Sequence, residues 1–192
     1  MKFKPNTATG NGAVQIEPGT YEAVLNEVRF YRAKRYQSEE YEPKAVLIWD
    51  LGEDEEGQPI RIWDFVRIPR DREGYPVINE KSNLYQRLTA LYGKPVDPME
   101  AELEIVLPEE YDSPEGLNNL PTFEEGKEEG FRPVTARSIK LNGEELLGKE
   151  ALVTVAEKNE RSVVQSVSPK PQAKRPKVKR LEAEAEAAGA PL

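Results

Sequence analysis

The segment 60–68 alternates between two kinds of side chain, and this alternation constrains the fold more than any other feature of the sequence. Every second residue from Ile60 onward is aliphatic, with the single exception of Asp64. The residues between them are aromatic or basic, namely Arg61, Trp63, Phe65 and Arg67. Because successive side chains of a β-strand point to opposite faces, the pattern predicts a strand with an aliphatic inner face and an aromatic, basic outer face.

Four other segments have the composition of strands: residues 21–31, 45–51, 149–156 and 161–167. The segment 45–51 is almost continuously apolar, which predicts a strand that is buried on both faces. Residues 17–20 form a predicted turn before the first strand, residues 52–59 a predicted hairpin connection, and residues 157–160 a tight turn between the last two strands. The chain therefore contains five predicted strands.

Helical spacing appears once, in the segment 82–92, where leucines recur at positions i, i+4 and i+7. Asn83 and Gln86 fit a capping-box pattern at its start. Gly93 and Pro95 provide the signal for its end. We therefore expect one short amphipathic helix between the third and fourth strands.

Three strands, a helix and two further strands is the element order of the oligonucleotide-binding (OB) fold, a five-stranded Greek-key barrel with a helix between strands three and four. We predict a mainly β, OB-like domain over residues 16–168. Residues 1–15 are predicted to be a flexible N-terminal arm. Residues 169–192 are predicted to be a tail that is first basic and then rich in Glu and Ala.

A long acidic insertion at about residues 94–140 interrupts this pattern between the helix and the fourth strand. Residues 97–130 contain twelve acidic side chains against a single basic one, Lys127. The insertion is also rich in Pro and Gly, so we expect it to be partly ordered at best, with one strand over residues 103–107.

The 192 residues include neither Cys nor His. This absence excludes disulfides, thiolate zinc sites, cysteine nucleophiles and catalysis by imidazole. The sequence also lacks a Gly-rich phosphate loop and a nucleophile elbow, so we expect no enzymatic activity, no cofactor and no metal site. No apolar run approaches the roughly 20 residues that cross a bilayer, and no apolar signal segment follows Met1, so we expect no membrane partner and a cytoplasmic location.

The net charge of −8 repels an anionic ligand unless that ligand meets a local basic surface. Cations and aromatic rings are interleaved on the outer face of segment 60–68 and near the end of the first strand. Such surfaces hold single-stranded DNA, because bases stack on the rings while the cations follow the phosphates. The predicted nucleic-acid-binding residues are Arg29, Tyr31, Arg32, Lys34, Arg35, Tyr36, Arg61, Trp63, Phe65 and Arg67, with Lys174, Arg175 and Lys177 of the tail.

Other interpretations remain open at this stage. The aromatic rings could pack in the core, with the arginines at its rim. The chain could instead be a protein-interaction or assembly module that works through its acidic insertion, or the insertion could shield the basic face from DNA. A metal-dependent nuclease using Asp50, Asp64 and Glu102 is a third possibility, although no fixed spacing links these three residues.

Several short motifs also resemble those of a known group of proteins. They are Ile16-Glu-Pro-Gly-Thr-Tyr-Glu-Ala, the Trp-containing third strand, Ala90-Leu-Tyr-Gly, Leu146-Leu-Gly-Lys-Glu-Ala-Leu-Val-Thr-Val and a closing Val-Gln-Ser-Val-Ser-Pro. Across residues 16–94 and 144–169 the chain resembles small phage-encoded proteins, grouped as domains of unknown function, that are associated with single-stranded DNA binding.

This resemblance implies an OB-like fold and a role in DNA replication or recombination inside the host cytoplasm. The candidate partners are single-stranded DNA, phage or host replication proteins and further copies of the chain, although the sequence does not determine an oligomeric state. The resemblance transfers no catalytic residue, and the long acidic insertion departs from the pattern of the group.

Overall fold

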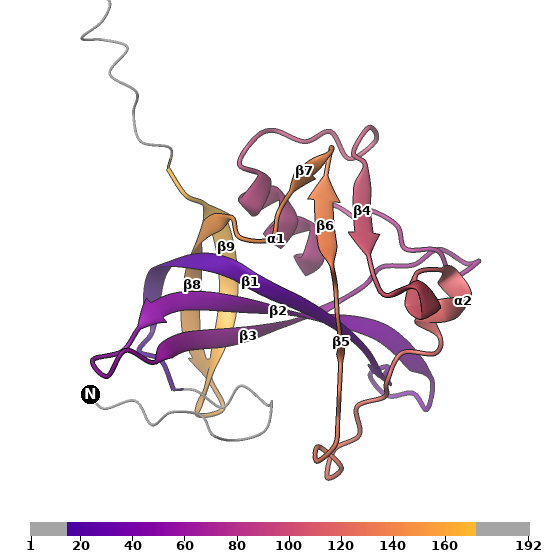
Figure 1. Ribbon diagram of the computed structural model, residues 1–192, viewed down its shortest axis with the longest axis horizontal. Coiled ribbons are helices and arrows are strands. Elements are labelled where there is room, and N and C mark those ends of the chain that lie inside the picture. Colours follow the sequence, from indigo (N-terminus) through magenta and orange to yellow (C-terminus); the bar gives the residue numbers. More distant parts are fainter. Residues whose placement is uncertain (1–14, 172–192) are drawn as a thin grey trace, which may run out of the picture.

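The computed structural model describes residues 15–171, which form two antiparallel sheets and one main helix (Figure 1). The strands of the main sheet are hydrogen-bonded in the order β3-β2-β1-β8-β9, and β5 also pairs with β1. The strands of this sheet are β1 (Gly19–Lys34), β2 (Tyr41–Glu53), β3 (Pro59–Arg67), β5 (Val134–Thr135), β8 (Glu150–Lys158) and β9 (Arg161–Pro169). The prediction of a mainly β chain is confirmed.

A smaller sheet, with the strand order β4-β6-β7, lies beside the main sheet (Figure 1). It consists of β4 (Leu103–Val106), β6 (Ser138–Leu141) and β7 (Glu144–Glu145). The helical elements are α1 (Asn83–Tyr92), the 3-10 turn η1 (Glu109–Tyr111) and α2 (Pro114–Leu117). Among residues 15–171, no helix is long and apolar enough to cross a bilayer.

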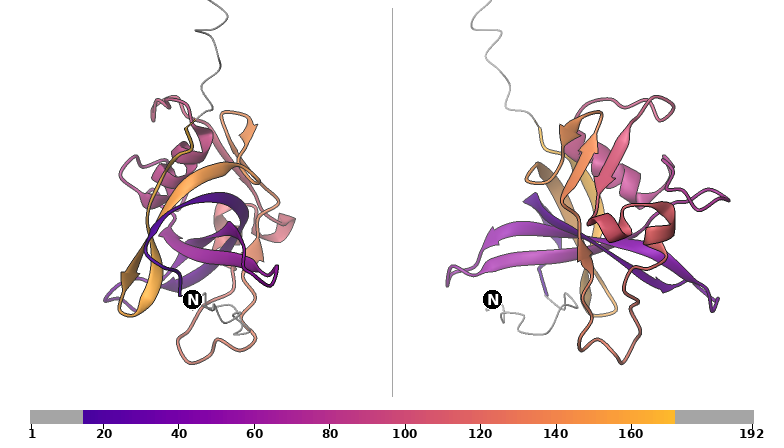
Figure 2. Two further views of the ribbon diagram at one scale, coloured as in Figure 1. Left: turned by 90° about the vertical axis from the view of Figure 1, so that its left-hand side faces the viewer. Right: turned by 45° about the vertical axis from the view of Figure 1, so that its right-hand side comes forward.

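A bulge in β1 keeps both halves of this long strand on the same core. The register against β2 shifts between Leu25 and Glu27. Ala23 and Leu25 are buried before the shift, and Val28 and Phe30 are buried after it. Because one extra residue reverses the alternation of side chains, the odd positions of the first half and the even positions of the second half face the same way. The strand bends accordingly, and the main sheet is strongly curled (Figure 2).

The burial of β2 and β3 follows the sequence pattern. Residues 45–49 of β2 are all buried, which confirms a strand covered on both faces. In β3 the even positions Ile62, Asp64 and Val66 are buried, whereas the odd positions are exposed or half-buried. The predicted division of β3 into an inner and an outer face is therefore confirmed.

The helix α1 occupies the predicted segment, but its N-cap differs from the expected one. The hydroxyl of Ser82 accepts a hydrogen bond from the backbone N–H of Tyr85 at 3.1 Å, so Ser82 caps the helix and Asn83 is its first residue. Gly93 ends the helix in the left-handed region, at φ 70°, as its sequence position predicts. The predicted capping box at Asn83 is wrong by one residue.

The main sheet is not closed into a barrel, so this part of the predicted fold is wrong. Within the described chain, β3 pairs only with β2, and β9 pairs only with β8. α1 contacts both of these edge strands. Its leucines Leu84, Leu88 and Leu91 are buried in the core, so apolar surface is covered on this side without a closing ladder of hydrogen bonds.

The acidic segment 94–140 is built into the fold, which differs from the expectation that it is partly ordered at best. It supplies β4, η1, α2 and β5 and most of β6, and the predicted strand at 103–107 corresponds to β4. Its aliphatic residues Leu107, Leu117, Leu120 and Ile139 are buried in the common core. Full burial of one such side chain contributes roughly 1.5–3 kcal/mol, which explains how a segment of this composition is held in place.

Candidate nucleic-acid interface

The register of β1, β2 and β3 places aromatic, aliphatic, basic and acidic side chains in rows across the outer face of the sheet. Each row contains one residue from each strand: Glu27, Ile48 and Trp63, then Arg29, Val46 and Phe65, then Tyr31, Lys44 and Arg67. Three aromatic residues and three cations therefore share this surface with a single carboxylate.

Trp63, Phe65 and Arg29 form the centre of this surface. The rings of Trp63 and Phe65 are 6.1 Å apart between centroids and are tilted by 51°. The guanidinium carbon of Arg29 lies 5.5 Å from the centroid of the indole ring, within the range of a cation–π contact. Phe65 is 54% exposed, so its ring can be reached by a flat ligand.

Tyr31, which the sequence predicts as a ligand contact, is covered by other aromatic rings and is only 5% exposed. Its ring makes edge contacts with Phe65 at 6.4 Å, with Phe123 at 6.4 Å and with Phe131 at 5.6 Å between centroids. Burial raises the pKa of the Tyr31 hydroxyl to about 12. Tyr31 therefore packs under these rings on the outer face of the sheet and does not offer an open ring.

Two of the rings that cover Tyr31, those of Phe123 and Phe131, belong to the loop 120–131, which Arg32 attaches to β1. The backbone N–H of Arg32 donates to the carbonyl of Pro121 at 2.8 Å, and the N–H of Phe123 donates to the carbonyl of Arg32 at 2.7 Å. The Nε atom of Arg32 donates to the carbonyl of Leu120 at 2.9 Å. Arg32, another predicted ligand contact, is therefore engaged in holding the loop.

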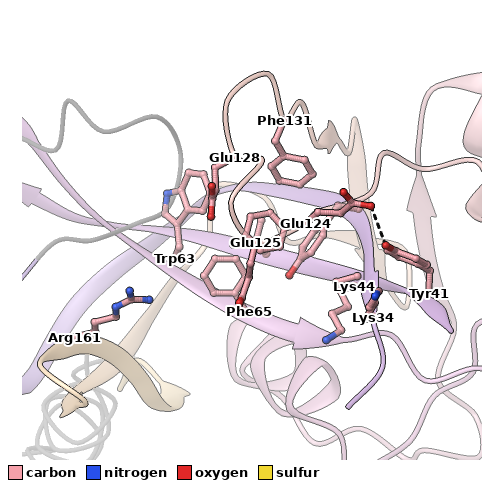
Figure 3. A pocket seen from close by; sticks show the side chains of 14 residues that line it. Lys34, Tyr41, Lys44, Trp63, Phe65, Glu124, Glu125, Glu128, Phe131 and Arg161 are labelled. Atoms are coloured by element: carbon pink, nitrogen blue, oxygen red, sulfur yellow. Dashed lines mark hydrogen bonds between the residues drawn. The ribbon is translucent and has the colours of Figure 1, made fainter. Parts of the chain in front are cut away.

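The loop and the sheet enclose a groove of about 1010 Å³, which we call the aromatic groove. Trp63 and Phe65 project into it from β3, and Phe131 faces them from the loop (Figure 3). Its charged lining consists of three cations and three carboxylates: Lys34, Lys44, Arg161, Glu124, Glu125 and Glu128. The groove therefore combines exposed rings with charges of both signs.

Glu124 is held in the groove by two hydrogen-bond donors. Lys127 Nζ lies 2.9 Å from Glu124 Oε2. The hydroxyl of Tyr41 donates to Glu124 Oε1 at 3.0 Å, and Figure 3 draws this hydrogen bond. These two donors lower the pKa of Glu124, and the same hydrogen bond raises the pKa of Tyr41. Glu124 is consequently ionised at neutral pH and opposes an incoming anion.

Four of the predicted cations have carboxylate partners. Their shortest nitrogen-to-oxygen distances are 2.8 Å for Arg29 and Glu27, 2.7 Å for Lys34 and Glu39, 3.9 Å for Arg61 and Asp50, and 3.2 Å for Arg67 and Glu42. Exposed ion pairs of this kind are weak and are screened by salt, so a phosphate group can replace the carboxylate.

The remaining predicted contacts lie away from the aromatic groove or outside the described chain. Arg35 and Tyr36 belong to the turn between β1 and β2, where Tyr36 is 87% exposed. Lys174, Arg175 and Lys177 lie outside the described residues 15–171. The structure therefore brings together Lys34, Trp63 and Phe65 in one groove, with Arg29 beside it.

Sequence reasoning missed five aromatic or basic residues of the groove: Tyr41, Lys44, Phe123, Phe131 and Arg161. A signal was present for two of them, because Phe123 and Phe131 are the only phenylalanines in an otherwise polar and acidic stretch. Large apolar residues in such a loop indicate that it packs against something.

The three carboxylates of the nuclease hypothesis do not form a site. Asp50 is close to Arg61, and Asp64 is buried against Arg87. Glu102 is in a different part of the molecule, where its backbone N–H bonds to Asn142. In residues 15–171, no group of three acidic side chains is arranged to hold a metal ion.

The aromatic groove thus offers ring faces for stacking and cations at its sides. Comparisons of the chain with models of protein families, with curated proteins and with solved structures found no match, so its function is inferred from this geometry.

Proposed function

We propose that this chain binds single-stranded DNA without catalysing a reaction, and that bases stack in the aromatic groove on Trp63 and Phe65. The observation that carries the proposal is the arrangement of an exposed Phe65 beside Trp63, with the Arg29 guanidinium over the indole. Stacking of one base on an aromatic side chain contributes about 1–3 kcal/mol, and every base has a flat face that can stack.

The order of the elements supports an open, OB-like arrangement. Five long strands form the sheet β3-β2-β1-β8-β9, and α1 lies in the chain between the third and the fourth of them. OB folds bind oligonucleotides on the face of strands two and three and on the loops that follow strands one and four. The aromatic groove lies on the corresponding face of β2 and β3, with Lys34 at the end of β1 and Arg161 at the start of β9.

The charges of the groove also fit this proposal. Lys44 belongs to the same outer face as Phe65, and Lys34 and Arg161 line the groove with it. Phosphates that follow these cations displace weak ion pairs with carboxylates and bound counterions, which makes binding dependent on salt. The basic tail residues Lys174, Arg175 and Lys177 and a role in a phage-type replication or recombination module belong to the same proposal.

The test is fluorescence anisotropy with a labelled oligothymidylate at low salt. Trp63→Ala should weaken binding by about 1–3 kcal/mol, since one stacked base is lost. Tyr92→Ala is the matched control, because Tyr92 is half-buried like Trp63 and has a cation, Lys94, 5.2 Å from its ring centroid, but does not line the aromatic groove. The proposal is wrong if the wild-type protein does not bind, or if Trp63→Ala binds as tightly as Tyr92→Ala.

A further inference from the structure

A second groove adjoins the aromatic groove, and Phe65 lines both of them. Its volume is about 820 Å³, and its lining comes from Glu42 of β2 and Arg35 of the turn before it, from the end of β3, from the connection between β3 and α1, and from the start of α1. We call it the basic groove because of its charges. A ligand that covers the exposed face of Phe65 can therefore extend into either groove.

The lining of the basic groove contains more cations than carboxylates. Its five basic residues are Arg35, Arg67, Arg70, Arg72 and Lys81. Its three acidic residues are Glu42, Asp71 and Glu73. This local excess of positive charge stands out in a protein whose net charge is −8.

Two of the three carboxylates of the basic groove already have hydrogen-bond or ion-pair partners. Asp71 accepts hydrogen bonds from the backbone N–H groups of Glu73 and Tyr75, at 2.9 and 3.0 Å, and so folds its own turn. Glu42 is 3.2 Å from Arg67. Asp71 and Glu42 are therefore not placed to neutralise the other cations of the groove, Arg35, Arg70, Arg72 and Lys81.

Four of the five cations have no acidic partner in the described part of the chain. Within residues 15–171, no carboxylate oxygen lies within 4.0 Å of the side-chain nitrogens of Arg35, Arg70, Arg72 or Lys81. Arg70 donates to the side chain of Asn118, which is neutral, at 3.4 Å. The basic groove therefore has the chemistry of a site for phosphates, with few rings for stacking.

We infer that a single strand bound on Trp63 and Phe65 continues past Phe65 into the basic groove, where its phosphates contact Arg72 and Lys81. The inference rests on the proposed function and divides the site into two parts. The aromatic groove holds bases, and the basic groove holds the backbone of the nucleotides that follow. Arg35 and Arg67 belong to this second part, because they line the basic groove and not the aromatic groove.

The two-part site makes binding depend on the length of the strand. OB folds engage about 4 to 16 nucleotides, so an oligothymidylate of about 4 nucleotides fills the aromatic groove alone, and one of about 12 nucleotides reaches both grooves. The longer probe should bind more tightly and with a steeper dependence on salt.

The test compares Arg72→Gln/Lys81→Gln with a matched double variant, Arg137→Gln/Lys140→Gln. The control changes the net charge equally and lies at the second sheet, outside both grooves. Each phosphate contact on a single strand contributes about 0.7 to the slope of log K against log salt concentration. For the 12-nucleotide probe, we therefore expect the slope of Arg72→Gln/Lys81→Gln to be shallower by about 1.4, with no change in the control.

A rise from about 50 to about 200 mM salt should lower the affinity of both proteins for the 12-nucleotide probe. The fold-loss of affinity should be about seven times smaller in Arg72→Gln/Lys81→Gln than in wild type. Binding of the 4-nucleotide probe should be the same in both proteins. Equal effects on the two probes, an effect no larger than in the control, or no effect at all would overturn the inference. The proposed function would survive these results if Trp63→Ala still weakened binding, whereas failure of wild type to bind either probe would overturn both.

Discussion

Arg87 of α1 donates a hydrogen bond from Nε to Asp64 Oδ2 of β3 at 2.9 Å, and each of the two residues is only 4% exposed. The indole N–H of Trp49 donates to the same oxygen at 3.3 Å. No ladder of hydrogen bonds closes the main sheet within the described chain. The buried ion pair therefore fastens the helix to an edge strand at the place where the sheet is open.

Breaking this pair should destabilise the protein strongly. Arg87→Met leaves the carboxylate of Asp64 in the core without its cation, and removal of one partner of a buried pair costs about 3–5 kcal/mol. Asp64→Leu/Arg87→Met should be more stable than Arg87→Met, because two apolar side chains then pack where one charge was isolated. The double variant should remain less stable than wild type, since the indole N–H of Trp49 loses its acceptor when Asp64 is replaced. Urea denaturation measures all three proteins, and a double variant no more stable than Arg87→Met would contradict this account.

The same pair predicts a dependence of stability on pH. Burial raises the pKa of Asp64, while Arg87 and the Trp49 N–H oppose that shift. A carboxyl whose pKa is raised by folding contributes stability that is complete below the unfolded pKa, about 4, and that is lost as the pH rises through the folded pKa. Arg87→Met removes the largest opposing influence and raises the pKa further. We therefore expect the free energy of unfolding of Arg87→Met to fall relative to wild type between about pH 4 and pH 7.

The control for this pH effect is Asp64→Leu/Arg87→Met, which has no carboxyl at position 64. Its free energy of unfolding should fall less over this pH range than that of wild type or of Arg87→Met, because both of those proteins have a carboxyl with a raised pKa at position 64. An equal decline in the double variant would assign the effect to a group other than Asp64.

The features that the sequence predicts correctly are those set by neighbours along the chain. The two faces of β3, the buried strand β2, the stop at Gly93 and the tight turn before Arg161 each depend on about ten residues or fewer. Asp64 was visible as an exception in an aliphatic row, but its partner Arg87 lies 23 residues away. A periodic pattern carries no information about a partner at that distance.

The same division applies to the candidate site. Trp63 and Phe65 could be predicted because the alternation of β3 turns them outward. The burial of Tyr31 could not be predicted, since it depends on Phe123 and Phe131 in a loop that joins β1 from about ninety residues further along the chain. The role of Arg32 could not be predicted for the same reason, because its side chain donates to the carbonyl of Leu120 in that loop.

Fluorescence offers a direct test of base stacking. Of the two tryptophans, Trp49 is fully buried and Trp63 is half-buried in the aromatic groove. An oligothymidylate that stacks on the indole should therefore quench the emission of Trp63 and leave that of Trp49 unchanged. Trp63→Phe should still bind, because a ring remains for stacking, but its emission should not respond to DNA. Quenching that persists in this variant would place the bases elsewhere.

The acidic side of the groove should reduce affinity for DNA. Glu124, Glu125 and Glu128 line it, so the triple change of these residues to Gln should strengthen binding by about tenfold at low salt and by less at high salt. Anisotropy titrations at several salt concentrations measure this difference.

A matched control separates the local effect from the change in net charge. Glu102, Glu104 and Glu109 are also exposed residues of the segment 94–140, but they do not line the aromatic groove. If their triple change to Gln strengthens binding as much, the effect comes from net charge and not from the position of the loop.

The acidic segment 94–140 covers part of the edge of β1 with which a strand of another copy of this chain could otherwise pair. β8 pairs with β1 only from Gly19 to Val24, and further along the strand β5 and the backbone of Pro121 and Phe123 bond to the same edge. A strand edge with free N–H and C=O groups is a template on which another molecule can add its own strand. Excision of residues 97–130 would uncover such an edge together with apolar surface, so the shortened chain should polymerise or precipitate. By covering this edge, the segment therefore also opposes self-association of the chain.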